Sequence, residues 1–189
     1  MRLWAISSTR RLTLLACTLC VVGAGALGAL AATQPAGAES SQTAIAAGTP
    51  RCGTSGLVIW LDTQGNGTLG SVYYQLQLTN LSGRTCTLSG YPGVSAVNLQ
   101  GRQLGRAGAR ESGAKARTVT LANGATAAAT LRIVVAGNFP TSSCKPTMAA
   151  GLRVYPPNQT TAKTVPFPFE ACSGSGPAVL SVGPVRKPS

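Results

Sequence analysis

The sequence predicts an all-β domain, an antiparallel Ig-like β-sandwich of about seven or eight strands with two disulfides. The chain of 189 residues contains 23 glycines and 12 prolines, and only 11% of its residues are charged. Such a composition favours strands and turns over helices. Short apolar or alternating segments recur along the chain between turn signals, as in a sandwich. Four cysteines follow residue 50, an even number that is typical of two disulfides in an exported domain.

The first strands are expected in the segment before residue 81. The continuous apolar run 57–61 predicts a strand that is buried on both faces. The glycine-rich segment 65–67 predicts a turn after it. In segment 71–80, Val72, Tyr74, Leu76 and Leu78 alternate with polar residues, so one face of this strand is expected in the core and the other in water.

A hairpin and several short strands are expected after that. Segment 94–99 predicts a strand whose hairpin tip lies at 100–101 and which returns through 102–104. Residues 105–116 are mostly glycine, alanine and charged residues and are expected to form a loop. Further strands are expected at 118–121, 125–135, 152–155, 163–165 and 178–182.

The first 38 residues have the pattern of a secretory signal peptide. Arg10 and Arg11 precede the apolar segment 12–32, and small residues at 36–38 form a cleavage site. An uncleaved membrane anchor and a lipidated Cys17 are the alternatives. Cleavage would leave 39–50 as a flexible leader and 51–185 as the β-sandwich domain, and would lower the net charge from +12 to +9. The protein is therefore expected to be secreted or held at the cell envelope.

The domain keeps four cysteines, for which three pairings are possible. We favour Cys52 with Cys86 and Cys144 with Cys172, because these pairs enclose only 33 and 27 residues. Each disulfide is expected to stabilise the fold by about 3 to 4 kcal/mol through chain entropy. No metal site and no cofactor is predicted, since the domain has no Cys-x-x-Cys spacing and the chain has no histidine.

An enzymatic activity is not predicted. Without histidine the chain lacks the usual general base near neutral pH. Asp62, Glu111 and Glu170 lie on separate turns, and nothing in their spacing forms the carboxylate pair of a glycosidase. Ser112 and Lys115 have the spacing of a Ser-x-x-Lys motif, but in a Gly/Ala-rich loop instead of at the start of a helix. A small extracytoplasmic hydrolase of unfamiliar type is the alternative.

A basic cluster in the 102–117 segment is the candidate binding site. Arginine matches phosphate and carboxylate oxygens with two parallel hydrogen bonds, so such a segment could hold an anionic polymer or membrane surface. No nucleic acid partner is expected outside the cytoplasm. A solvated basic loop without a ligand is the alternative interpretation. The candidate anion contacts, opposed only by Glu111, are Arg102, Arg106, Arg110, Lys115 and Arg117.

Several motifs resemble one known family. Segment 77–80 reads Gln-Leu-Thr-Asn, segment 86–94 reads Cys-Thr-Leu-Ser-Gly-Tyr-Pro-Gly-Val, and segment 118–121 reads Thr-Val-Thr-Leu. With the later cysteines they resemble the secreted actinobacterial family called domain of unknown function 4232, over about residues 52–183. The resemblance implies an exported Ig-like or similar sandwich and supplies no catalytic residues. The expected function is a non-enzymatic binding or structural module of the cell envelope.

Overall fold

The computed structural model describes residues 48–188 and confirms the all-β fold class. The expected signal segment 1–38, and the leader up to residue 47, lie outside the described residues. The described part has eleven strands instead of seven or eight. Several of the strands are very short, and two of them contain only two residues each.

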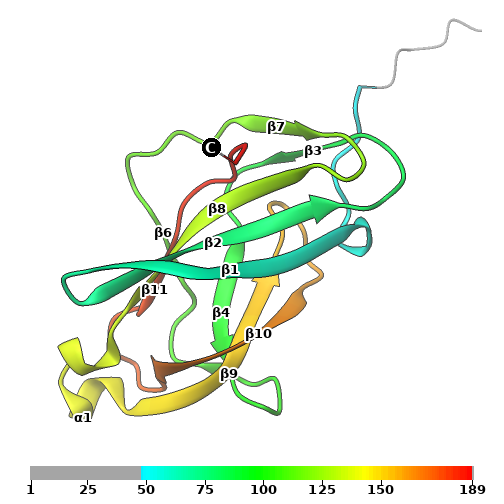
Figure 1. Cartoon of the computed structure of the whole chain (residues 1–189). Coiled ribbons are helices and arrows are strands. Elements are labelled where there is room, and N and C mark those ends of the chain that lie inside the picture. The colour runs from blue at the N-terminus through cyan, green and yellow to red at the C-terminus, as the bar shows by residue number, and fades with distance from the viewer. Residues whose placement is uncertain (1–47, 189) are drawn as a thin grey trace, which may run out of the picture. The chain divides into compact units, whose positions relative to one another are not determined.

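The larger sheet has five strands in the order β1-β2-β8-β11-β6. Neighbouring strands are antiparallel, except that β11 and β6 run parallel. Figure 1 shows β1, β2 and β8 side by side along this sheet. The strands are β1 (Leu57–Thr68), β2 (Ser71–Asn80), β8 (Thr126–Val134), β11 (Leu180–Val182) and β6 (Ala109–Arg110).

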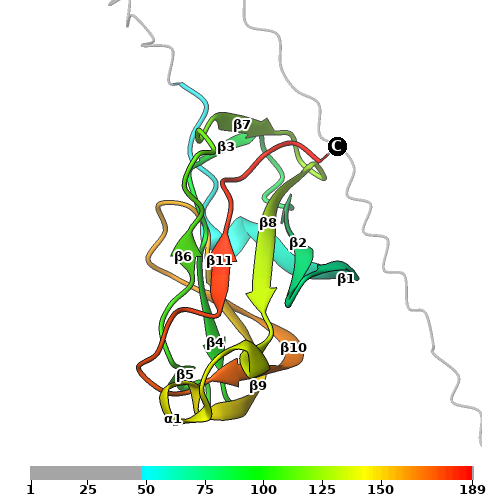
Figure 2. The ribbon, with the colours of Figure 1, turned by 90° about the vertical axis from the view of Figure 1, so that its left-hand side faces the viewer.

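A four-stranded sheet and a two-stranded pair complete the domain. The four-stranded sheet has the order β10-β9-β4-β5, and the pair is formed by β3 and β7. Figure 2 shows β3 and β7 at one end of the domain, β9 and β10 toward the opposite end, and β8 and β2 between them. The strands are β10 (Lys163–Cys172), β9 (Pro146–Tyr155), β4 (Gly93–Val97), β5 (Gln103–Leu104), β3 (Cys86–Ser89) and β7 (Thr118–Leu121). Three single-turn helices complete the described elements: η1 (Thr54–Gly56) precedes β1, and η2 (Ala136–Asn138) and α1 (Thr141–Cys144) lie between β8 and β9.

One hydrophobic core joins all three groups of strands. Leu76 and Leu78 of β2 are fully buried, as the alternation in this strand predicts. Leu152 of β9 and Leu121 of β7 belong to the same cluster. Because each fully buried leucine contributes about 1.5–3 kcal/mol, these contacts dominate the packing of the sandwich.

The prediction that segment 57–61 is buried on both faces is wrong. Leu57, Ile59 and Leu61 face the core, but Val58 is 43% exposed and Trp60 is 44% exposed. The reason is that β1 is an edge strand of an antiparallel sheet whose other face meets solvent.

The predicted turn at 65–67 is wrong as well. Strand β1 continues to Thr68 through a change of register between Asp62 and Asn66. The chain reverses at Leu69 and Gly70, which both have positive φ angles. Glycine alone enters this backbone region without a steric cost, so Gly70 is the residue that suits the turn.

Two segments contain more regular strand structure than the sequence predicts. The last strands were expected to be short, but β10 extends to Cys172 and contains Pro166 and Pro168. This is possible because β10 lies at the edge of its sheet. On the open side of an edge strand an N–H group has no neighbouring strand to bind, so a proline that lacks this group costs no hydrogen bond there. The expected loop 105–116 contains β6, which pairs with β11.

The structure contains two disulfides, in the pairs that we favoured. Cys52–Cys86 connects the N-terminal segment to β3, and Cys144–Cys172 connects α1 to the end of β10. The Cα atoms are 4.9 and 4.5 Å apart, within the usual range. Among the described helices, none has the length and apolar character needed to span a membrane.

Candidate functional site

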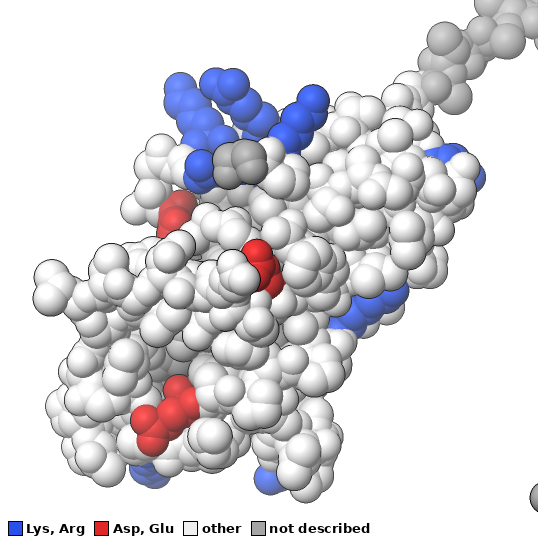
Figure 3. All heavy atoms as spheres, viewed as in Figure 1, with Lys and Arg blue, Asp and Glu red and all other residues white. Residues whose placement is uncertain are grey.

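A basic groove lies between the loop that precedes β7 and the C-terminal segment of the described chain. It is open and encloses about 760 Å³. Figure 3 shows lysine and arginine side chains gathered at the end of the domain where Figure 1 places β7 and the C-terminal segment. The residues that line the groove are Gly113, Ala114, Lys115, Arg117, Thr118, Val119, Val185, Arg186 and Lys187.

One side of the groove is fixed by Tyr91. The hydroxyl of Tyr91 donates a hydrogen bond to the carbonyl oxygen of Ala114 at 2.6 Å. The guanidinium carbon of Arg110 lies 5.7 Å from the centre of the same ring, a cation–π contact. The backbone N–H of Glu111 donates to the carbonyl of Val182, so the start of the loop is tied to β11. The segment that carries Lys115 is therefore held in place although it has no regular structure.

The other side of the groove is fixed by backbone hydrogen bonds of the C-terminal segment. Val185 is buried, and its N–H donates to the carbonyl of Gly90 at 2.9 Å. Arg186 and Ala128 exchange two backbone hydrogen bonds of 2.8 Å. Arg186 and the adjacent Lys187 are thereby placed opposite the loop that carries Lys115.

Sequence reasoning missed these two residues because they follow the predicted basic segment by about seventy positions. Their local signal is an Arg186-Lys187 pair between Pro184 and Pro188. Prolines on both sides favour an extended backbone and remove two donors. That pattern could have been recognised as an exposed basic segment, but nothing in it identifies the partner loop.

The structure divides the basic cluster predicted from the sequence. Lys115 and Arg117 line the groove, and Arg110 contacts Tyr91 beside it. Arg102 lies in the hairpin between β4 and β5, where its backbone N–H donates to Asn98. Tyr91 precedes β4 whereas Arg102 follows it, and a five-residue strand spans about 16 Å. The five predicted contacts therefore do not form one site.

The groove has a strongly positive rim. Of the described residues that line it, none is acidic. The neighbouring carboxylate of Glu111 accepts a hydrogen bond from the hydroxyl of Ser181 at 3.2 Å. Asp62 and Glu170 belong to β1 and β10, in different sheets. Four cations around an open groove create a local positive potential that attracts anions.

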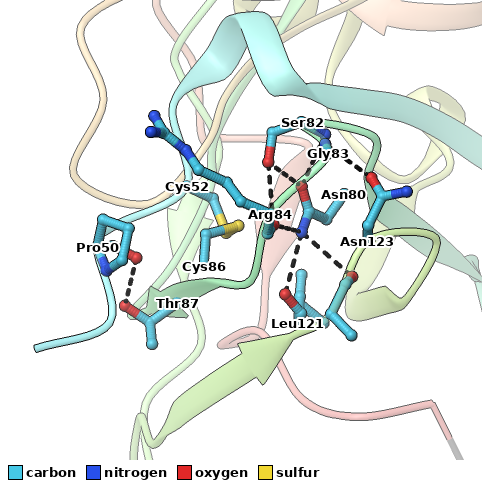
Figure 4. Close-up of a disulfide and its surroundings, with 11 residues drawn as sticks. Pro50, Cys52, Asn80, Ser82, Gly83, Arg84, Cys86, Thr87, Leu121 and Asn123 are labelled. Atoms are coloured by element: carbon cyan, nitrogen blue, oxygen red, sulfur yellow. Dashed lines mark hydrogen bonds between the residues drawn. A yellow bond between two sulfur atoms is a disulfide. The ribbon is translucent and has the colours of Figure 1, made fainter.

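A second polar cluster surrounds Asn80, next to the Cys52–Cys86 disulfide (Figure 4). Asn80 is completely buried. Its amide nitrogen donates to the carbonyls of Arg84, Leu121 and Ala122, and its side-chain oxygen accepts from the N–H and the hydroxyl of Ser82. The amide nitrogen and the side-chain oxygen of Asn80 already have hydrogen-bond partners. We therefore assign Asn80 a structural role, which is to join the loop after β2 to the residues at the end of β7.

Within residues 48–188, no group of three or more histidine, cysteine, aspartate or glutamate side chains is placed so that it could hold a metal ion. The four described cysteines are bonded in pairs.

The fold places the chain among small, disulfide-linked β-sandwich domains. More specifically, the chain belongs to the family described as Domain of unknown function (DUF4232), whose sequence profile matches residues 52–186. The match includes both disulfides and all the described strands, in agreement with the resemblance noted from the sequence. No curated protein and no solved structure matches the chain.

Proposed function

We propose that the domain is a non-enzymatic binding module of the cell envelope, which holds an anionic polymer in the basic groove. The observation that carries this proposal is the meeting of four cationic side chains, Lys115, Arg117, Arg186 and Lys187, around one open groove. Arginine supplies paired hydrogen bonds to phosphate or carboxylate groups, and lysine supplies charge.

The rigid support of the groove favours binding. Val119 and Val185 are 5% and 1% exposed, so both walls are anchored in the core. The hydrogen bond from Tyr91 to Ala114 restrains the loop before the ligand arrives. A site whose backbone is already ordered loses little entropy when a ligand binds.

The location outside the cytoplasm is part of the proposal. Two disulfides are typical of proteins that fold in an oxidising compartment. The expected signal peptide supports the same location. We expect the native protein in the extracytoplasmic fraction, with a mass that shows the loss of residues 1–38; a cytoplasmic protein with an intact N-terminus would contradict this part.

Binding is tested by neutralising the groove. In the groove variant, the four groove cations Lys115, Arg117, Arg186 and Lys187 are changed to glutamine. In the control variant the same number of charges is removed elsewhere, by changing the exposed Arg51, Arg84, Arg102 and Arg106 to glutamine. Binding to inorganic polyphosphate and to purified cell-wall fragments is measured at increasing NaCl concentrations.

We expect the groove variant to bind at least tenfold more weakly than the unmodified protein, and the control variant to bind within about threefold of it. Binding should weaken as salt rises, because exposed charges are screened. Equal losses in the two variants would show that net charge alone attracts the polymer, and the proposed site would be wrong.

A further inference from the structure

The outer face of the five-stranded sheet carries a continuous row of side chains that ends at the basic groove. Trp60 of β1 lies opposite Gln77 of β2, and Gln77 lies opposite Ala128 of β8. Ala128 in turn lies opposite Arg186, through an isolated antiparallel bridge. Residues directly opposite each other in antiparallel strands share one face. Three steps of about 4.8 Å make the row about 14 Å long.

An exposed indole stands at the far end of this row. Trp60 is 44% exposed, although its position in the strand is well ordered by pairing with β2. Its ring nitrogen donates a 3.4 Å hydrogen bond to the hydroxyl of Thr79, which shares a 2.9 Å hydrogen bond with Thr126. The ring is thus tied to the sheet while much of its surface stays open to solvent.

The side chains around Trp60 are carboxamides and hydroxyls of β2 and β8, with the apolar Val58 and the carboxylate Asp62 two residues away on β1. Gln75 lies one row further along β2, between Asp62 and Thr130. The carboxamide oxygen of Gln77 is buried without a hydrogen-bond partner, the one such side-chain atom among the described residues. A buried acceptor without a donor costs free energy, and this one belongs to the residue directly opposite Trp60.

A second aromatic side chain extends this face. Tyr73 lies opposite Arg132, whose guanidinium carbon is 5.9 Å from the centre of the tyrosine ring. The Nε of Arg132 donates to the hydroxyl of Ser71, which fixes the guanidinium group. The face therefore combines aromatic rings with carboxamides, hydroxyls and a guanidinium, and carries the carboxylate of Asp62 at its β1 edge.

We infer that this face binds a glycan strand with anionic substituents, whose sugar rings stack on Trp60 and whose charged groups reach Arg186. A sugar ring has an apolar C–H side that matches an aromatic surface, and a rim of hydroxyls that matches amide donors and acceptors. A lipid bilayer would gain nothing from the carboxamides and hydroxyls that flank Trp60. The inference rests on the proposed function, because it extends the basic groove into a longer site for one class of anionic polymer.

The test separates sugar stacking from charge attraction. Binding to polygalacturonate, a polymer of anionic sugars, is compared with binding to inorganic polyphosphate, which has charge but no sugar ring. Trp60→Ala removes the stacking surface, and Trp60→Tyr keeps an aromatic ring. Met148→Ala is the matched control, since Met148 is an exposed apolar residue on β9, in the other sheet. The natively purified protein is used, and urea unfolding verifies that each variant is folded.

We expect Trp60→Ala to bind polygalacturonate at least tenfold more weakly, with polyphosphate binding unchanged. Trp60→Tyr should stay within about threefold of the unmodified protein, and Met148→Ala should bind like it. Unchanged polygalacturonate binding in Trp60→Ala, or no polygalacturonate binding by the unmodified protein, would overturn the inference. Neither result would contradict the proposed binding of an anionic polymer in the basic groove. If the groove variant bound both polymers as tightly as the unmodified protein, the proposed function would be wrong.

Discussion

The hydroxyl of Tyr91 donates its hydrogen bond to the carbonyl oxygen of Ala114, and so connects the start of β4 to the loop that carries Lys115. We predict that Tyr91→Phe weakens polyphosphate binding severalfold while the free energy of unfolding falls by only about 1 kcal/mol. The lost hydrogen bond is worth about that amount, and a freer loop must be ordered when the ligand binds. Hydrogen exchange of residues 111–117 and binding titrations measure the two effects. Equal exchange in both proteins would show that the tyrosine does not restrain the loop.

Asn80 should be among the most sensitive polar positions. Asn80→Ala removes the amide donor of three carbonyl oxygens and the acceptor of the Ser82 N–H and hydroxyl. The carbonyls of Ala122 and Arg84 keep a second donor, from the Ala125 N–H and the Ser82 hydroxyl, whereas the buried Leu121 carbonyl and the Ser82 N–H lose the partner that Asn80 supplied. We expect the free energy of unfolding in urea to fall by about 3 kcal/mol or more, since buried groups without partners each cost 1–3 kcal/mol. Asn123→Ala is the control, because the exposed Asn123 side chain accepts one bond, from Gly83. That change should cost about 1 kcal/mol or less.

The two disulfides should contribute nearly equally to stability. Their sequence separations are 34 and 28 residues. On the chain-entropy account, loops of these lengths stabilise the fold by about 3.5–4 kcal/mol each and differ by less than about 0.5 kcal/mol. The variants with Cys52 and Cys86, or Cys144 and Cys172, both changed to alanine are compared by urea unfolding. A much larger loss for one pair would show that contacts other than loop closure dominate there.

Gly105 should not tolerate a side chain. Its φ is +58°, and a Cβ atom would lie 2.1 Å from the carbonyl oxygen of Cys172. Gly101→Ala is a matched control, because Gly101 also has a positive φ, +71°, but open space around it. We expect thermal unfolding to show a loss of about 1 kcal/mol for Gly101→Ala, from backbone strain alone, and a clearly larger loss for Gly105→Ala. Equal losses would mean that the chain near Cys172 moves aside freely.

The sequence predicts strand β2 well and β1 poorly, for one reason. In β2 the outward residues are mostly polar, so the two-residue period is visible in the sequence. In β1 the outward Val58 and Trp60 are themselves apolar, which hides the same period. The sequence pattern therefore predicts burial for Trp60, which the structure places at the exposed end of the proposed glycan row.

Only one side of the groove could be predicted from the sequence. The charges at Lys115 and Arg117 are close in sequence and indicate a basic loop. Their partners across the groove are placed by the bridge between Ala128 and Arg186, a pairing of distant segments that no local pattern shows. Arg102 was grouped with Lys115 by sequence distance, whereas strand β4 separates them.

The placement of the disulfides also determines how the domain would respond to a pulling force. If the chain were stretched while anchored at the envelope, the segments enclosed by Cys52–Cys86 and Cys144–Cys172 could not extend. These segments, of 34 and 28 residues, would shorten the fully stretched molecule by about 200 Å. An unfolded domain with both disulfides intact would therefore extend less far than one with reduced disulfides. Reduction of the disulfides would add the length of the two enclosed segments.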